Sequence, residues 1–283
     1  MTLEEIAINA FLEAYKHHQL LGKAGEKRKR KNRYGEVALE ADIASEEIII
    51  NSLRNSGLPL KLVTEEHGEL DLSLNPILLG VIDGLDGTNR YLASRNGEDK
   101  NAKYGPILGI FSNTNPKYKE YLFSGLIDFS TGRIFYAIKG EGSFVFLPES
   151  GHKRIKCSNG QKLKKGSKIY LDRYFDEQSD PKDKLFGKLK KFNVQDARSY
   201  VAYHSELASG EVSAVITFTR KGNLEMAGTY GLVKESGGDI FTIDQRSIGE
   251  ESFFNFGQDG ILRPIISAPN KKIAREISNL IRS

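Results

Sequence analysis

The sequence contains little cysteine, no long apolar run and no strong excess of charge of one sign. Its single cysteine, Cys157, excludes an internal disulfide framework, and no histidine stands nearby to make it a catalytic thiol. No window has the apolar length of a membrane span, and the N-terminus lacks the charged-then-apolar plan of a signal peptide. These absences predict a cytoplasmic protein that does not enter a membrane.

The charges are nearly balanced. The chain has 41 lysines and arginines against 37 acids, a formal net charge of +4 that does not mark a nucleic-acid binder. Positive charge is nevertheless concentrated in the basic run 27–33, Lys-Arg-Lys-Arg-Lys-Asn-Arg, which repels itself unless it is solvated or faces an anion. We interpret this run first as an exposed loop between two helices. Attraction of a phosphorylated substrate and contact with nucleic acid are the alternatives.

The 283 residues are enough for a sizeable core. The pattern predicts an α+β fold with two halves, 1–150 and 151–283, and no flexible linker, so we expect the functional site between the halves. Helices are predicted at 2–22, 40–54, 182–192, 200–209, 225–235 and 271–281. Strands are predicted at 60–63, 76–83, 106–111, 121–129, 133–146 with a turn at 140–142, 168–171, 212–218, 239–243 and 264–267.

The most informative stretch is Asp83-Gly84-Leu85-Asp86-Gly87-Thr88, which directly follows the apolar run 77–82. A buried strand that ends in two carboxylates and a hydroxyl suits a hard cation such as Mg²⁺, and the cysteine or histidine cluster that zinc prefers is absent nearby. An ordinary Asp-Gly turn is the simpler alternative. The spacing D-x-x-D, rather than D-x-D, argues against an aspartyl-phosphate mechanism of the haloacid-dehalogenase type and favours attack on phosphate by a metal-activated water.

Three further acidic segments stand in order along the chain. They are G-E-V-A-L-E-A-D, which ends at Asp42, the pair Glu65-Glu66, and L-E-M-A-G with Glu225, which leads to Gly237-Gly238. Together with the stretch at 83–88 they resemble the four motifs of the inositol monophosphatase family of Mg²⁺-dependent phosphatases. Segment 125–137 also resembles the central hairpin of that family. The resemblance covers most of the chain and implies an α-β-α-β-α layered sandwich that commonly forms homodimers.

The resemblance implies a set of metal ligands for two to three Mg²⁺ ions. Glu65, Asp83 and the backbone carbonyl of Leu85 would hold the first ion, and Asp83, Asp86 and Glu225 the second. Taken alone, an acid such as Glu225 is equally compatible with a helix-start charge that favours the helix dipole. The prediction of a metal site rests on all these acids occurring together and in the order of the family's motifs.

The resemblance also implies catalytic and phosphate-binding roles. Glu65 and Asp42 would help to hold a third, weaker ion or orient water, and Thr88 would hydrogen-bond the attacking water. Glu65, Thr88 and Asp42 therefore form the expected catalytic set. The backbone N–H groups of Gly87 and Thr88 would point at the phosphate, as they do at anion-binding helix ends. In the family a lysine of the basic run approaches the metal site, which corresponds to Lys31.

The chain departs from the family pattern at several positions of the site. Glu225 and Leu224 stand where the family has Asp and Trp, Gly84 replaces Pro, and Leu39 replaces Thr. The longer arm of Glu225 can still reach a metal but would shift or weaken that ion. The polar insertion 94–104 is expected to overhang the site as a lid or a specificity element.

The substrate end of the site differs as well. Phe218 stands near the position of the acid that contacts inositol in animal members of the family, which argues against cyclitol recognition. Arg198, Arg220 and Lys221 predict contacts to a second phosphate instead, with plain surface charge as the alternative. We expect a Mg²⁺-dependent phosphomonoesterase for a small sugar, cyclitol or nucleotide phosphate, of the inositol 1-phosphate or fructose 1,6-bisphosphate type. A 3′(2′),5′-bisphosphate nucleotidase, and a weakened family member that binds RNA or protein through 27–33, are the alternatives.

Overall fold

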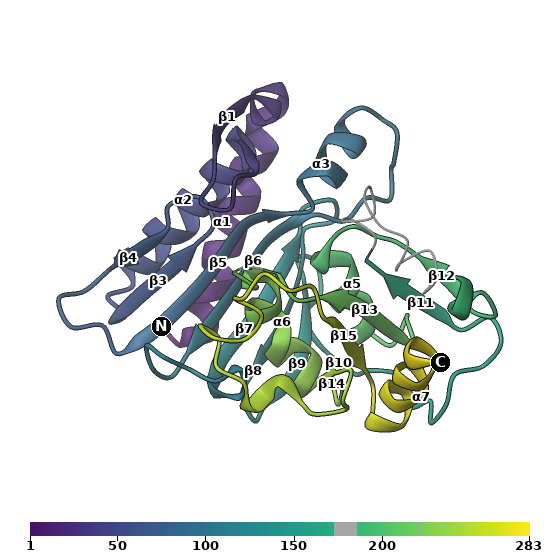
Figure 1. Cartoon of the computed structure of the whole chain (residues 1–283). Helices are drawn as coiled ribbons and strands as arrows, with labels where there is room; N and C mark the ends of the chain where they lie inside the picture. The colour runs from purple at the N-terminus through teal and green to yellow at the C-terminus, as the bar shows by residue number, and fades with distance from the viewer. Residues whose placement is uncertain (173–185, 221) are drawn as a thin grey trace.

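The described part of the chain, residues 1–172, 186–220 and 222–283, forms two large β-sheets, a two-stranded ribbon and the helices that cover the sheets in a computed structural model (Figure 1). Its helices are α1 (Leu3–Leu21), α2 (Glu40–Asn55), α3 (Thr88–Arg95), α5 (Tyr200–Ala208), α6 (Leu224–Glu235) and α7 (Lys271–Arg282). Its strands are β1 (Arg28–Lys31), β2 (Val37–Leu39), β3 (Leu60–Thr64), β4 (Glu69–Asp71), β5 (Leu78–Asp86), β6 (Gly105–Phe111), β7 (Tyr121–Asp128), β8 (Arg133–Ile138), β9 (Gly142–Leu147), β10 (Gly151–Ile155), β11 (Lys168–Leu171), β12 (Asn193–Gln195), β13 (Ala214–Phe218), β14 (Asp239–Thr242) and β15 (Pro264–Ala268).

Both large sheets are mixed. The eight-stranded sheet has the order β10-β9-β8-β7-β6-β5-β3-β4, and its one parallel pair is β3 with β5. The five-stranded sheet has the order β12-β11-β13-β15-β14, with β11 parallel to both β12 and β13. Strands β1 and β2 form a separate antiparallel ribbon. The order of the strands places β5, which carries the acidic motif, inside the larger sheet.

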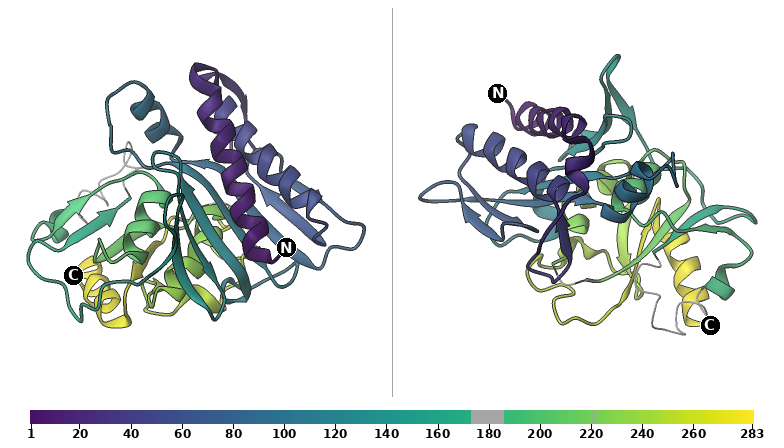
Figure 2. Two further views of the ribbon diagram at one scale, coloured as in Figure 1. Left: turned by 180° about the vertical axis from the view of Figure 1, so that it is seen from behind. Right: turned by 90° about the horizontal axis from the view of Figure 1, so that it is seen from above.

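Helices α1 and α2 cover one face of the eight-stranded sheet, as the view from behind shows (Figure 2). Helix α1 begins with a capping box, in which the Thr2 hydroxyl accepts the Glu5 N–H and the Glu5 carboxylate accepts the Thr2 N–H. Phe11 of α1 and Leu53 of α2 are fully buried in one apolar cluster with Phe123 of β7. This packing forms the first interface of the sandwich.

Helices α5 and α6 form the layer between the two sheets. Their apolar side chains share a cluster with Ile107 of β6 on one side and Val215 of β13 on the other. The neighbours of Val215 on the strand, Ala214 and Ile216, point to the opposite face and pack with α7, as the alternation of a strand requires. The order of layers is therefore α-β-α-β-α, which confirms the fold class predicted from the sequence.

The basic run 27–33 differs from the predicted loop. Residues Arg28–Lys31 form strand β1, which pairs with β2 in an antiparallel ribbon. All four side chains of β1 are exposed, and Lys29 forms an ion pair with Glu40. Water therefore solvates the like charges on both faces of the ribbon. The sequence does not predict this strand, because β1 has no alternation of apolar and polar residues.

Other elements differ from the prediction at their bounds. Strand β10 joins the eight-stranded sheet, so that sheet continues to Ile155, past the expected boundary at residue 150. The predicted strand 212–218 begins at Ala214. Of the predicted helix 182–192, residues 182–185 lie outside the described residues, residues 186–189 are helical and residues 190–192 are not. Short, exposed strands such as β4 and β12 carry too few apolar residues to be recognised. Among the described residues no helix is long and apolar enough to span a membrane.

Strand β5 and helix α2 approach each other closely at Gly84. A Cβ at this position would lie 2.4 Å from the backbone oxygen of Asp42 and 2.9 Å from the Cβ of Glu46. Only glycine leaves room for the helix backbone there. Gly84 thus permits a contact that brings the acids of α2 beside the end of β5.

We predict that Gly84→Ala lowers the free energy of unfolding by about 1 to 3 kcal/mol, because the new methyl group forces α2 and β5 apart. Urea denaturation followed by circular dichroism measures this change. Gly160→Ala is the matched control, because the nearest atom to a Cβ there is 3.7 Å away. Equal stability of the two variants would contradict the close approach.

Candidate functional site

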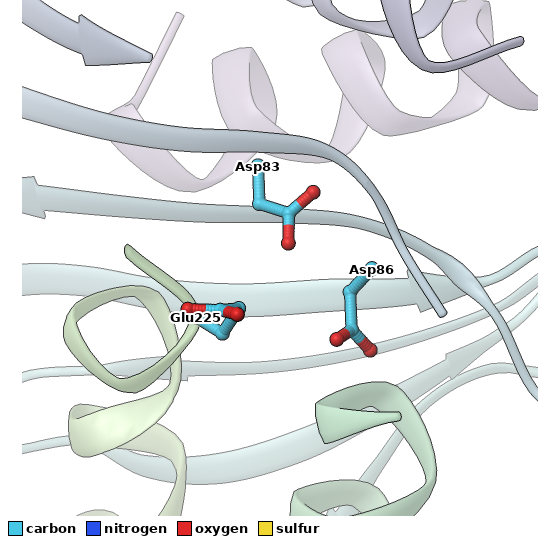
Figure 3. A group of neighbouring side chains, drawn as sticks. All are labelled: Asp83, Asp86 and Glu225. Carbon is cyan, nitrogen blue, oxygen red and sulfur yellow. The ribbon is translucent and has the colours of Figure 1, made fainter. Parts of the chain in front are cut away.

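Strand β5 ends in an irregular step that presents two carboxylates to one cleft. Asp83 pairs with Ile107 of β6 and Asp86 with Gly105, and the register shifts between them. Asp83 and Asp86 are only 3% and 7% exposed. Glu225, in the first turn of α6, faces them across the cleft (Figure 3), and one carboxylate oxygen from each of the three residues lies within 4.8 Å of the other two.

Hydrogen bonds hold the two aspartates in place. Asp83 Oδ1 accepts the backbone N–H of Leu85 at 2.9 Å, within the same turn. Asp86 Oδ2 accepts the Ser199 hydroxyl at 2.6 Å and the Val201 N–H at 2.8 Å, at the beginning of α5. Asp86 is therefore oriented by the helix layer that separates the two sheets.

Glu65 is positioned by residues that the sequence analysis did not identify. The fully buried carboxylate of Glu46 on α2 accepts the backbone N–H groups of residues 65, 66 and 67, which shapes the turn after β3. Asn32, beyond β1, donates its side-chain N–H to Glu65 Oε1 at 2.7 Å. Glu46 stands four residues after Asp42, on the same helix face, and that spacing could have indicated it. Asn32 carries no comparable signal.

Asp42 and Thr88 form a hydrogen-bonded pair at the edge of the site. The Thr88 hydroxyl donates to Asp42 Oδ1 at 2.8 Å, and Asp42 Oδ2 accepts the Leu39 N–H at 2.8 Å. The Leu85 carbonyl oxygen lies 3.1 Å from the same hydroxyl. Since a hydroxyl has one proton but two lone pairs, Thr88 can also accept a hydrogen bond from a water.

Gly87 begins α3 in a left-handed conformation, with φ of 81°. A Cβ at this position would lie 3.0 Å from Ser199 Cβ, so glycine satisfies both the turn and the close approach of α5. Gly87 and Thr88 line the cleft at the N-terminus of the helix. That end of a helix carries the unsatisfied N–H groups that bind anions.

The cleft has a volume of about 250 Å³ and draws its walls from both sheets and the layer between them. Predicted residues in its lining are Glu65, Asp83, Leu85, Asp86, Gly87, Thr88, Arg198, Arg220 and Glu225. Asp42 is not in the lining itself, but it accepts a hydrogen bond from Thr88, which is. The lining also includes residues that the sequence analysis did not identify, among them Tyr34, Glu36, Asp172 and Tyr200.

Three expectations about the rim of the cleft need correction or stay open. Lys31 is exposed and, among the described residues, is not part of the lining; Tyr34 and Glu36 of the same ribbon turn inward instead. The insertion 94–104 contributes no described residue to the lining, and Asp99 within it forms an ion pair with Arg90 of α3. Lys221 lies outside the described residues.

The buried acids repel one another in the absence of a cation. Burial, and then the charges of Glu65 and Asp86, raise the pKa of Asp83 well above its usual value, and burial followed by the Glu225 charge does the same for the pKa of Glu65. Burial raises the pKa of Asp86 to about 6, against the hydrogen bonds from Ser199 and Val201. A divalent cation would relieve this repulsion, and an all-oxygen donor set matches Mg²⁺.

The cations of the cleft have different surroundings. Arg220 is bonded to Asp172 and to Glu225, so two carboxylates already share its charge. Arg198 is 55% exposed at its side chain and faces Asp196 at 3.4 Å. Phe218 is buried in the cluster with α7, on the far side of the smaller sheet. The wall that the sequence analysis assigned to a second phosphate therefore has Arg198 as its more exposed cation.

Comparison with known proteins decides the family. The model of the inositol monophosphatase family matches residues 1–282. The chain belongs to the inositol monophosphatase family. This is a family of phosphatases that depend on Mg²⁺ in general.

Individual relatives support the family and the fold. A fructose-1,6-bisphosphatase/inositol-1-monophosphatase of Methanothermobacter thermautotrophicus is 28% identical over 143 residues, which is 47% of each chain, so the match spans about half the length of that relative. The extragenic suppressor protein suhB of Bartonella henselae has a TM-score of 0.78 at 16% identity, over 99% of this chain and 98% of its own. An IMPase of Thermotoga maritima has a TM-score of 0.75 at 16% identity, over 100% and 97%. These structural likenesses show the shared fold.

We predict that Asp83→Asn removes the stabilisation of this inositol monophosphatase family member by Mg²⁺ without unfolding it. In the wild type, Mg²⁺ at about 100 times its dissociation constant should add about 2.7 kcal/mol of stability. The variant loses one of the carboxylates that converge in the cleft but keeps the volume of the side chain, and without metal it should unfold at or above the wild-type temperature because one buried charge is gone. Differential scanning calorimetry with Mg²⁺ or EDTA measures both effects.

Asp259→Asn serves as the control, because Asp259 is exposed and bonded to Arg263 outside the cleft. It should keep the full response to Mg²⁺. A normal Mg²⁺ response in Asp83→Asn would show that the cation binds elsewhere.

Proposed function

We propose that the protein is a Mg²⁺-dependent phosphomonoesterase that hydrolyses a small sugar, cyclitol or nucleotide phosphate. The observation that carries this proposal is the convergence of Asp83, Asp86 and Glu225 within 4.8 Å in a cleft, at the N-terminus of α3. Carboxylates bind the cation and the helix end binds the anion, which together fit a phosphate ester. A single class of substrate explains both features.

The proposed ligands follow the placement of the acids. Glu65, Asp83 and the Leu85 carbonyl would hold one ion, Asp83, Asp86 and Glu225 a second, and Glu65 with Asp42 a third. Bound Mg²⁺ would supply positive charge to the phosphate oxygens and lower the pKa of a bound water. The protein's own groups would orient the attacking water and hold the phosphate.

Glu65, Thr88 and Asp42 form the proposed catalytic set. Because the Thr88 hydroxyl proton is held by Asp42 Oδ1 at 2.8 Å, the lone pairs of Thr88 are available to orient a water. Glu65, which lines the same cleft, would help to orient that water. The N–H groups of Gly87 and Thr88 would hold the phosphate, and the rest of the substrate would face Arg198 and Tyr34.

The proposal also covers the cellular compartment of the protein and its oligomeric state. We infer that the protein acts in the cytoplasm, since its single cysteine, Cys157, is a free, buried thiol. We also infer a homodimer, which is common in the family. Sedimentation of the purified protein tests the dimer.

A phosphate-release panel tests the proposed activity. Inositol 1-phosphate, fructose 1,6-bisphosphate, adenosine 3′,5′-bisphosphate and histidinol phosphate are incubated with the protein in Mg²⁺ and in EDTA. We expect release from at least one ester, in Mg²⁺ alone. No release from any ester, together with RNA binding that falls steeply with salt, would instead favour a weakened family member that binds through residues 27–33.

Thr88 provides a specific test of the catalytic set. Thr88→Val should lower kcat about 100-fold with little change in KM, because it removes the oxygen that orients the water but keeps the shape of the side chain. Thr88→Ser keeps the hydroxyl and should retain most of the rate. Steady-state kinetics at saturating Mg²⁺ compares the two, and equal rates would remove Thr88 from the mechanism.

A preference for a bisphosphate is the second candidate, and the exposed Arg198 in the cleft wall favours it. A second phosphate would form a charge-assisted contact with this guanidinium. Arg198→Gln should therefore lower kcat/KM for fructose 1,6-bisphosphate about 10-fold and leave inositol 1-phosphate nearly unchanged. An equal loss for both esters would contradict a second-phosphate site.

A further inference from the structure

Arg220 connects Glu225 to the smaller sheet. Its Nη1 donates to Glu225 Oε1 at 3.3 Å, and its Nη2 donates to Asp172 Oδ2. Asp172 follows the end of β11 and is only 1% exposed. The guanidinium also lies over the Tyr200 ring, 5.4 Å from its centroid, at the beginning of α5. Three separate elements thus fix the orientation of one arginine.

Glu225 needs such support more than an aspartate would. Its side chain has one more rotatable bond than Asp, so fixing its carboxylate as a ligand costs additional conformational entropy. A guanidinium is planar and offers its donors in a rigid fork, so one group can bind two carboxylates in a set geometry. Arg220 uses one arm of the fork for Asp172 and the other for Glu225.

The charges support a positioning role over direct binding of a substrate anion. Asp172 and Arg220 together are neutral, so the pair adds no net charge beside Asp83 and Asp86. If Arg220 moved to a substrate anion, the buried carboxylate of Asp172 would lose a charged partner, which is costly. Arg198 lies in the same cleft, with a more exposed side chain.

We propose that Asp172 and Arg220 are positioning residues, which hold Glu225 in the orientation that binds the divalent cation. This inference rests on the proposed function, since it takes Glu225 as a ligand. It also explains how this chain accommodates glutamate where the family has aspartate. Residues that orient a metal ligand in this way commonly contribute 10- to 100-fold to metal affinity.

The test is a double-mutant cycle on metal binding, with Mn²⁺ as the probe and isothermal titration calorimetry as the readout. Asp172→Asn with Arg220→Gln removes the ion pair but conserves the net charge of the site. We expect this pair variant to weaken Mn²⁺ binding about 10-fold. Glu225→Gln should also weaken it, and adding the pair variant to Glu225→Gln should cause no further loss, because both act through the same carboxylate.

A control and a second variant keep the result interpretable. Asp259→Asn with Arg263→Gln removes an exposed ion pair elsewhere and should leave Mn²⁺ affinity at the wild-type value. If circular dichroism shows that the pair variant is unfolded, Arg220→Lys replaces it. Lysine keeps the charge but cannot bridge both carboxylates, so a several-fold loss of affinity is expected, again absent in the Glu225→Gln background.

The outcomes separate this inference from the proposed function. Additive losses, or unchanged or tighter Mn²⁺ binding in the pair variant, would overturn the positioning role while Glu225 stays a ligand. Wild-type Mn²⁺ affinity in Glu225→Gln would overturn the ligand assignment itself, and with it the positioning role. Loss of phosphate release with unchanged metal binding would place Arg220 at the substrate instead.

Discussion

Repulsion among buried carboxylates is the constraint on which the rest of this site depends. Glu65, Asp83, Asp86 and Glu225 line one cleft, and burial with the neighbouring carboxylates raises the pKa values of Glu65, Asp83 and Asp86, so the ionised forms of these three are costly in the absence of a cation. Hydrogen bonds from backbone and side-chain donors hold the acids in this arrangement. A divalent cation would turn the same repulsion into binding energy, and the fold would gain stability when the site is loaded.

The layered architecture explains why the site requires both sheets. Strand β5 of the larger sheet supplies Asp83 and Asp86, whereas Glu225 comes from α6 in the middle layer. The beginning of α5 orients Asp86, and Asp172 at the end of β11 reaches Glu225 through Arg220. A shift between the larger sheet and the middle layer would separate Asp83 and Asp86 from Glu225, so the packing of these two layers sets the geometry of the site.

The parts of the site that the sequence predicts are those whose chemistry lies within a few consecutive residues. The segment from Asp83 to Thr88 contains a strand end, a turn and a helix start. Its acids could be predicted as site residues from these neighbouring residues alone, without information on distant contacts. Helices α1 and α2 were predicted for the same reason, since their apolar spacing is local. Strand β1 was missed because its charged residues gain their structure from pairing with β2.

The parts that could not be predicted depend on contacts between distant segments. Asn32 reaches Glu65 across 33 residues and Arg220 reaches Asp172 across 48. Neither pair has a signature in its own neighbourhood. Lys31 was predicted at the site from its distance along the chain to Asp42, but the ribbon turns Tyr34 and Glu36 inward instead.

A crystal of the protein soaked in Mn²⁺ gives the most direct test of the central claim. Anomalous scattering locates the ion without reference to any assumed ligand. The account predicts peaks in the cleft within about 2.3 Å of carboxylate oxygens of Asp83, Asp86 and Glu225. Full occupancy of Mn²⁺ at other sites, with no peak between these three residues, would contradict it.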